Sequence, residues 1–335
     1  MPDPAEAEPV PLADDDDSIL PFALDALDVR GRVARLDRTI DQILTQHAYP
    51  PAVSGLLAEA TLLTALIGQT IKLRDRFSIQ VRGQGAVTML ATDYFAPAYE
   101  GKPAFMRAYA AYAEDALGTA QGIDLLGQGL MGVTIDQGTG QPYQGVTPLQ
   151  GSSLAECAEA YFAQSEQIAT RFALAAAYAS QPGSPEAWRA GGIVLQHMPK
   201  ASPLMSGAQQ SAAAPDSLMT GDDVAALTGE EDRWRNATLK LATVEAHELL
   251  GPHLPLQRLL LSLFHEDGPR VWEPQEVRFG CTCGAAKLEG VLGAYDRAAL
   301  DEMAEDGRIT ADCQFCGKQY AFEVDALLQG AEQTR

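Results

Sequence analysis

Apolar side chains recur at helical spacing in two neighbouring stretches near the start of the chain. Intervals of three and four residues over 33–44, before Pro50-Pro51, predict an amphipathic helix. Its apolar members are Val33, Leu36, Ile40, Ile43 and Leu44. Residues 52–73 predict a second helix that is apolar on almost every face, because Glu59 is its only charge before Lys72. We therefore expect this second helix to be a buried central helix.

Strict alternation of polar and apolar residues follows at 77–81. The chain then turns at Gly83-Gln-Gly85 and returns over 86–90, which predicts a β-hairpin. A second β-rich segment is expected at 129–149, and a further strand at 190–198. Residues 152–179 predict a helix that holds the odd cysteine, Cys157, as a small buried hydrophobe rather than a reactive thiol. These patterns indicate an α+β fold.

Composition divides the chain into five predicted parts. Residues 1–18 form an acidic tail that we expect to be disordered, with order beginning near Leu20–Phe22. Residues 19–200 form an N-terminal α+β domain of mixed sheet and helix, and 201–223 a flexible insertion rich in Ser, Ala and Gly. A helical linker is expected over 224–275. The last part, 276–330, is a small C-terminal domain that begins near Val277 and contains four of the five cysteines.

The linker is predicted to hold two helices, over 234–250 and 255–264, with conspicuously apolar faces. We expect these faces to be buried against the N-terminal sheet and the C-terminal domain. If they were uncovered, they would form an apolar surface able to bind unfolded chains. The candidate client-binding residues are Leu239, Leu241, Val244, Leu249, Leu256, Leu259, Leu260, Leu263 and Phe264.

Charge excludes several classes of partner. The 335 residues carry a net charge of −21, which repels nucleic acids and anionic membranes. The most apolar region, 56–71, is interrupted by Glu59 and Gln69, so a membrane span is not expected. The first basic residue is Arg30, so a secretory signal is not expected either. We expect a cytoplasmic protein, whose reduced cysteines are metal ligands or redox sensors before they are structural disulfides.

The clustered cysteines form two pairs. Cys281 and Cys283 are a Cys-x-Cys pair, Cys313 and Cys316 are a Cys-x-x-Cys pair, and residues 284–312 separate them. Four thiolates in a tetrahedron suit one Zn²⁺. A domain this small with few large apolar residues usually needs its metal to fold. A disulfide within the Cys-x-Cys pair would close a strained ring, and strained disulfides are labile or regulatory.

Spacing alone leaves a structural zinc ribbon and a redox switch equally open. A zinc ribbon that binds nucleic acid is disfavoured, because residues 278–330 hold five Lys or Arg against nine Asp or Glu. Neither cysteine pair lies at a strand-to-helix turn of a βαβ pattern, as a thioredoxin-like reductase requires. The five histidines lack metal-ligand spacing. Because no catalytic triad order, phosphate loop or dinucleotide fingerprint occurs, an enzyme is not indicated.

The chain resembles the heat shock protein 33 family over about 22–328. The resemblance rests on the cysteine unit with Tyr320 and on four segments in the family's order, 48–60, 79–85, 161–167 and 191–196. One family segment, Gly-x-Val-Arg-Gly-Tyr, appears here only as Phe105-Met-Arg-Ala-Tyr109, with Ala108 where glycine is usual. The insertion at 201–223 and the acidic tail also depart from the family's pattern.

The resemblance implies a redox-regulated holdase chaperone that works without ATP. In such proteins the reduced form binds one Zn²⁺ through the four cysteines and is inactive. Oxidation would form the disulfides Cys281–Cys283 and Cys313–Cys316, release the zinc and loosen the linker. Dimers would then hold unfolded or oxidatively damaged clients until ATP-driven refolding chaperones take them. The alternative is a constitutive structural zinc-ribbon protein that binds nucleic acid or protein partners.

Overall fold

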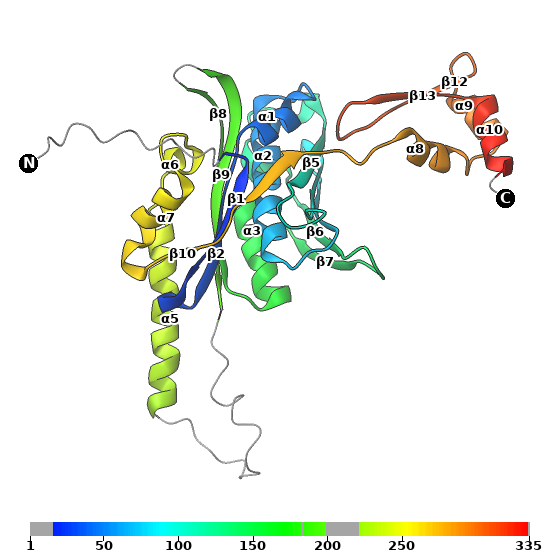
Figure 1. The fold of residues 1–335 in the computed structure, drawn as a ribbon. Coiled ribbons are helices and arrows are strands. Elements are labelled where there is room, and N and C mark those ends of the chain that lie inside the picture. The colour runs from blue at the N-terminus through cyan, green and yellow to red at the C-terminus, as the bar shows by residue number, and fades with distance from the viewer. Residues whose placement is uncertain (1–15, 182–183, 199–220, 334–335) are drawn as a thin grey trace, which may run out of the picture.

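The computed structural model describes residues 16–181, 184–198 and 221–333. Most of the expected acidic tail and residues 201–220 of the expected insertion lie outside the described residues. Residues 221–223 of that insertion begin helix α5 (Gly221–Leu241). Helices cover both faces of one large sheet, and a small C-terminal unit projects from one side of it (Figure 1).

The sheet has eleven strands, ten of them in the order β7-β6-β3-β4-β5-β11-β1-β2-β9-β8, while β10 pairs with β1 beside this path. One half of it consists of β3 (Arg76–Gly83), β4 (Val87–Phe95), β5 (Ala104–Tyr112), β6 (Gly129–Asp136) and β7 (Tyr143–Pro148). The other half consists of β1 (Ser18–Leu24), β2 (Val29–Leu36), β8 (Thr170–Gln181), β9 (Ser184–His197) and β10 (Arg270–Val271). The predicted hairpin at 77–90 is confirmed as β3 and β4, and the segment at 129–149 as β6 and β7.

Strand β11 (Gln275–Phe279) joins the two halves. It runs parallel to β5 and antiparallel to β1. Val277 is fully buried in the main core, where its alternating strand pattern points it inward. The expectation that the cysteine-containing domain begins near Val277 is therefore wrong, because this segment completes the large sheet and the separate unit starts after it.

The buried central helix is confirmed as α2 (Pro51–Thr70). It packs across β3, β4, β5 and β9, with most of its apolar side chains in the main core. Contrary to the expectation from sequence, α2 is long and apolar enough to pass as a membrane span, with a mean hydropathy of 1.5. However, 78% of that window is buried inside the fold, which is the environment of a core helix.

The first predicted helix is only half right. Helix α1 (Arg38–Thr45) contains Ile40, Ile43 and Leu44, but Val33 and Leu36 belong to β2. The two strand residues face opposite sides of the sheet, and helices cover both sides, so both side chains are buried. A strand buried on both faces lacks simple alternation, and its apolar positions can imitate helical spacing.

Order begins earlier than expected. Ser18 and Ile19 pair with β11, and the side chain of Asp17 accepts hydrogen bonds from the backbone N–H groups of Asp37, Arg38 and Thr39. The carboxylate thereby satisfies the free donors at the start of α1. The expected disordered tail is consequently wrong for residues 16–18.

The helix expected over 152–179 ends early. Helix α3 (Leu154–Tyr161) passes through a single π turn, η4 (Phe162–Glu166), and the chain reverses at Gln167, which has a φ of 56°. The alanine-rich residues beyond 170 form β8 and pair with β9 in a long hairpin. Pairing with a neighbouring strand here outweighs the helical propensity of alanine. Elsewhere in the chain there are four short 3₁₀ turns, namely η1 (Asp25–Leu27), η2 (Glu114–Ala116), η3 (Gly122–Leu125) and η5 (His265–Asp267).

The linker forms α5, α6 (Ala246–Leu250) and α7 (Leu256–Phe264). The helix predicted over 234–250 is thus two helices, whereas the one over 255–264 is confirmed. They lie on the face of the β1-β2-β9-β8 half opposite α2 and form a second core with it (Figure 1). No residue of the C-terminal unit belongs to this core among those described, so the expected support from that unit is wrong.

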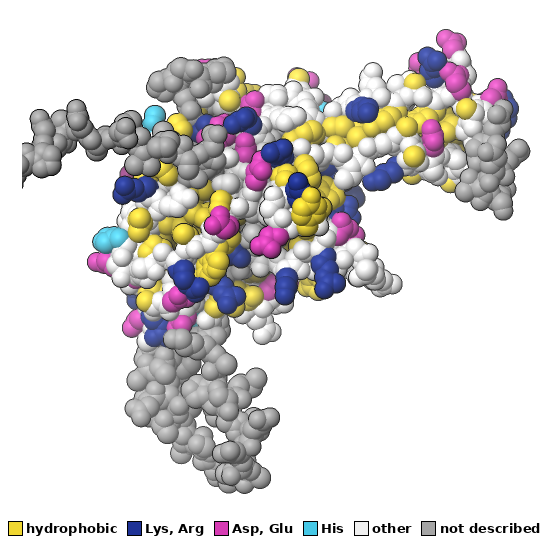
Figure 2. Space-filling model, in the orientation of Figure 1, with side chains coloured by type: hydrophobic (Ala, Val, Ile, Leu, Met, Phe, Trp, Pro, Cys, Tyr) yellow, Lys and Arg dark blue, Asp and Glu magenta, His cyan; other side chains and the backbone are white. Residues whose placement is uncertain are grey.

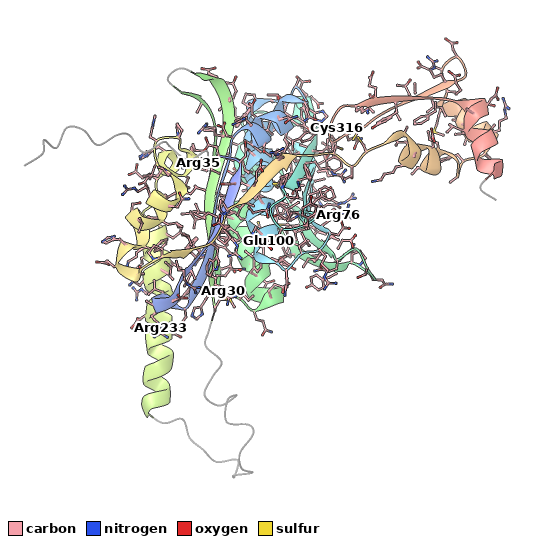
Figure 3. All side chains as sticks on the ribbon, viewed as in Figure 1. Arg30, Arg35, Arg76, Glu100, Arg233 and Cys316 are labelled. Carbon is pink, nitrogen blue, oxygen red and sulfur yellow. The ribbon has the colours of Figure 1, made fainter. Side chains whose placement is uncertain are left out.

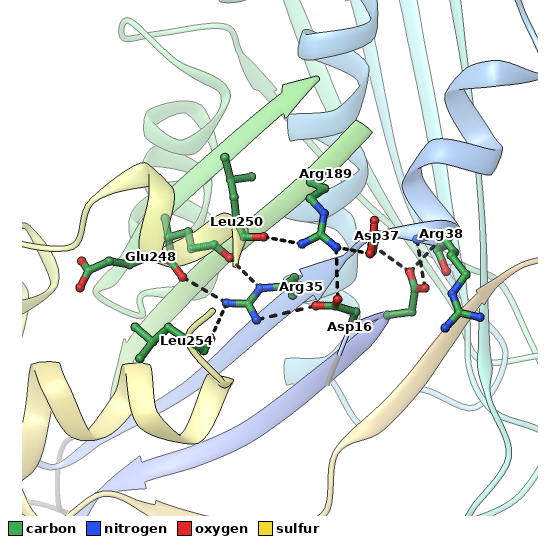
Figure 4. A network of polar contacts seen from close by, with 11 residues as sticks. Asp16, Arg35, Asp37, Arg38, Arg189, Glu248, Leu250 and Leu254 are labelled. Atoms are coloured by element: carbon green, nitrogen blue, oxygen red, sulfur yellow. Dashed lines mark hydrogen bonds and ion pairs between the residues drawn. The ribbon is translucent and has the colours of Figure 1, made fainter. Parts of the chain in front are cut away.

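Two buried arginines tie the linker to the sheet (Figure 4). Arg35 of β2 donates hydrogen bonds to the carbonyls of Glu248, Leu249 and Leu254 over 2.9–3.1 Å. Arg189 of β9 donates to the carbonyl of Leu250 over 3.0 Å, and both arginines pair with Asp16. Cations at the end of α6 satisfy carbonyls that the helix leaves free.

The C-terminal unit is small. It contains α8 (Ala285–Leu292), α9 (Arg297–Met303), the hairpin of β12 (Arg308–Asp312) and β13 (Gln319–Glu323), and α10 (Val324–Gln333). Its core has five buried side chains, namely Leu300, Ile309, Phe322, Val324 and Leu327. Hydrophobic side chains also run along its surface where it leaves the sheet (Figure 2).

Candidate metal centre

The four clustered cysteines meet at one point, and Cys316 marks it where the C-terminal unit joins the sheet (Figure 3). Cys281 and Cys283 lie on the loop after β11, and Cys313 and Cys316 lie on the turn between β12 and β13. Their four Sγ atoms all lie within 4.8 Å of one another. Across the two pairs, the Sγ atoms of Cys281 and Cys313 are 3.7 Å apart and those of Cys283 and Cys316 are 3.4 Å apart.

The backbone turn explains why the second pair converges. The N–H groups of Cys316 and Gly317 both donate to the carbonyl of Cys313, and Gly317 has a φ of 64°, which favours glycine. The N–H of Cys313 donates to the carbonyl of Lys318. This tight turn directs both sulfurs to the same side, toward the loop that carries the first pair.

The geometry fits a tetrahedral thiolate site. Four sulfurs at about 2.3 Å from a Zn²⁺ would be about 3.8 Å apart, close to the separations found here. All four are free thiols. Within the described residues, this is the one cluster of Cys, His, Asp or Glu side chains compact enough to share a metal ion.

The thiols differ in acidity. Burial raises the pKa of Cys283, but the hydroxyl of Tyr320, which donates to its Sγ over 3.1 Å, and the neighbouring thiols lower it in net to about 7. Burial raises the pKa of Cys281, and it raises the pKa of Cys316 to about 12. Without a cation the cluster therefore resists carrying four negative charges, because thiolates this close repel one another.

The N-terminal sheet contributes a cation to this cluster. Nη1 of Arg107, on β5, donates to Cys281 Sγ over 3.8 Å and to Thr282 Oγ1 over 3.1 Å. Arg107 lies in the segment 105–109 that departs from the family's pattern, and nothing in its spacing indicates a contact with the cysteines. Only the pairing of β5 with β11 brings it there.

The candidate client-binding residues are mostly covered. Leu239 is exposed, with 59% of its surface accessible, and the other eight pack on the sheet face under the linker. Six of these eight are fully buried, namely Leu241, Leu249, Leu256, Leu259, Leu260 and Phe264, and Val244 and Leu263 are partly buried. The fifth cysteine, Cys157, lies on the buried face of α3 and donates to the carbonyl of Gln150.

Comparison with known proteins gives a consistent answer. A family model described as Hsp33 protein matches residues 17–323. The 33 kDa chaperonin of Caulobacter vibrioides is 34% identical over 317 residues, which covers 92% of this chain and 95% of that protein. The 33 kDa chaperonin of Pseudomonas paraeruginosa is 32% identical over 311 residues and 92% of each chain.

A solved structure supports the fold. The crystal structure of the 33 kDa chaperonin (heat shock protein 33 homolog) of Thermotoga maritima has a TM-score of 0.73, covers 95% of this chain and 99% of its own, and is 21% identical. Its family is one of chaperones rather than enzymes, and the four clustered cysteines are suited to metal binding and to redox-sensitive disulfides. The match over almost the whole sequence shows that the chain belongs to the Hsp33 family of chaperones.

Proposed function

We propose that the protein is a redox-regulated, ATP-independent holdase chaperone, inactive when Cys281, Cys283, Cys313 and Cys316 are reduced and bind one Zn²⁺. The observation that carries the proposal is the convergence of four reduced thiols in the part of the molecule with the smallest apolar core. A bound Zn²⁺ would hold these sulfurs as thiolates and cross-link the two loops. The folding of the unit would thereby depend on the oxidation state of its cysteines.

Oxidation of all four cysteines would remove every ligand of the metal. Four thiolates give up four electrons and form the disulfides Cys281–Cys283 and Cys313–Cys316. With peroxide as the oxidant, two molecules take up these electrons and four protons and leave as water. The unit then loses its cross-link, and five buried side chains are too few to keep it folded.

The linker would supply the surface that binds unfolded proteins. Its helices bury an apolar face on the sheet, and the same face would bind an unfolded chain once it separates. β10 and β11 connect the linker to the cysteine unit along one edge of β1, so unfolding of the unit would loosen the end of the linker. Unfolded or oxidatively damaged proteins are the proposed partners, held by an active homodimer for ATP-driven refolding chaperones in the cytoplasm. The net charge of −21 would keep the exposed state soluble.

Zinc content and free thiols, measured together before and after peroxide, test the switch. We expect one zinc per chain, lost together with four thiols, and suppression of client aggregation only by the oxidised, warmed protein. Metal that stays bound after full oxidation would exclude the switch. Equal protection by reduced and oxidised protein would indicate a constitutive chaperone, and salt-sensitive binding of RNA or DNA would indicate the zinc-ribbon alternative.

A further inference from the structure

Arg107 is a residue of the sheet that contacts the cysteine cluster directly. Its Nε donates to Asp93 Oδ2 on the neighbouring strand over 2.7 Å, and Ser78 donates to the other oxygen of Asp93 over 2.5 Å. The side chains of Arg107 and Asp93 are only 12% and 7% exposed. The carboxylate therefore fixes one edge of the guanidinium, which leaves Nη1 directed at Cys281 and Thr282.

Two aromatic rings also pack against the same guanidinium. The ring of Phe315, between the two cysteines of the Cys-x-x-Cys turn, lies 4.0 Å from Cζ of Arg107, and the ring of Phe95 lies at 5.2 Å. Tyr109, two residues further along β5, also contacts Phe315, with the ring centroids 6.3 Å apart. One side chain of the sheet thus contacts both cysteine loops, the first through Cys281 and the second through Phe315.

We propose that Arg107 is a positioning residue that holds the metal-bound cysteine unit on the sheet and strengthens its hold on the metal. Four thiolates around a divalent cation carry a net charge of −2, and a fixed guanidinium stabilises that charge. Hydrogen bonds to ligand atoms commonly determine metal affinity in this way. The stacked Phe315 adds a contact that lasts only while the turn is folded.

The inference rests on the proposed function and extends it to the contact between the two parts. When Cys281 forms a disulfide, its sulfur loses its negative charge, and Arg107 loses the anion it binds. The unit is then released from β5 as well as unfolded. Because β11 pairs with both β5 and β1, release of the unit from β5 would also weaken the pairing of β11, the strand that follows the linker.

The test is a chelator competition for Zn²⁺ on the full-length reduced protein. Replacing Arg107 alone would leave Asp93 buried without its partner, so the test variant is Asp93→Asn with Arg107→Met, which removes both charges. The controls are Asp93→Asn, whose amide oxygen can still accept the hydrogen bond from Nε of Arg107 and so keep the arginine at the thiolate, and Arg82→Met, an exposed arginine of β3. We expect the double variant to bind zinc about 10–100-fold more weakly than either control.

Hydrogen exchange supplies a readout that metal affinity alone does not. In the zinc-loaded double variant, amides of the 313–317 turn should exchange faster, while those of β8 and β9, which lie away from the substituted residues, should not change. Unchanged affinity and unchanged exchange in the double variant would overturn the role of Arg107. A wild-type protein that binds zinc and releases it on oxidation would still support the proposed switch in that case, whereas failure of the wild-type protein would exclude the switch itself.

Discussion

The main core and the C-terminal unit are stabilised by different means. In the main core, α2 and the sheet bury dozens of apolar side chains, many of them with no accessible surface. The C-terminal unit buries five, and its helix α8 buries none. Burial of apolar area can stabilise the first region without help, whereas five buried side chains can stabilise the second only weakly, and the proposed metal would supply the rest. A molecule built this way can lose one region and keep the other.

The linker packs against the first region, but along the chain it is connected to the second. Its helices share a core with β1, β2, β8 and β9, yet the two strands that follow them, β10 and β11, lead directly to the cysteines. Polar anchors reinforce the contact at Arg35 and Arg189 (Figure 4). Removing the metal should therefore weaken the C-terminal unit, whereas removing an arginine anchor should weaken the contact between the linker and the sheet.

Chelation of the metal should have the largest effect. Metal binding to four thiolates contributes on the order of 10–16 kcal/mol in zinc peptides, so a strong chelator should unfold the C-terminal unit. Hydrogen exchange by mass spectrometry should show lost protection across β12 and β13, with protection in α2 unchanged. Equal loss of protection in α2 would mean that the two regions are stabilised together, contrary to the comparison above.

Arg35→Met should release the linker while leaving the main core folded. The substitution removes donors from two carbonyls of α6, from the carbonyl of Leu254 in the loop before α7, and a partner from Asp16, at a cost on the order of 3–5 kcal/mol. We expect faster hydrogen exchange in α6 and α7 and more binding of a hydrophobic dye in the reduced protein. Arg30→Met, an exposed position on the same strand, is the control and should change neither property. Exchange that stays slow in α6 and α7 would show that the apolar core alone holds the linker.

These anchors mark the limit of what the sequence could predict. The buried helix 52–73, the hairpin at 77–90 and the convergence of the four cysteines follow from local pattern and spacing. Arg35, Arg107 and Asp17 make their contacts with segments far away in the chain, and no local period encodes them. β11 escaped prediction for the same reason, because its place depends on β5 and β1.

Pairing between strands also outweighed the intrinsic helix propensity of some residues. The alanine-rich residues 173–177 favour a helix when taken alone, but β9 offers a complete row of backbone partners, and the small side chains fit against both covered faces of the sheet. Val33 shows the reverse problem, since a strand buried on both faces gave the spacing of a helix. The spacing of apolar residues is the least reliable guide to secondary structure where an element is buried on both faces.

Glu59→Gln should stabilise the main core in a pH-dependent way. Burial raises the pKa of Glu59 above its ordinary value of 4.5, so between pH 4.5 and that raised pKa the folded state binds more protons than the unfolded state. Wild-type stability should therefore fall as pH rises through this window. Urea unfolding at pH 7 should find the variant more stable than the wild type, with the difference shrinking toward pH 4. A variant that is less stable at pH 7 would indicate that the carboxylate has a stabilising partner.

Cys157→Ser should have the smallest effect. The serine hydroxyl can keep the hydrogen bond to the carbonyl of Gln150, and burial raises the pKa of the native thiol, which keeps it protonated and unreactive. Zinc content, the loss of four thiols on oxidation and chaperone activity should match the wild type. Loss of zinc in this variant would mean that the ligand set includes a cysteine of the main core.

The position of β11 has a consequence for how the chain is made. Its five residues, 275–279, lie between the two halves of the sheet, but they leave the ribosome long after β1 and β5. Until then the facing edges of those two strands have no partner in the final order, and unpaired edges invite aggregation during synthesis. A nascent Hsp33 chain of this architecture is therefore itself a candidate client until its eleventh strand arrives.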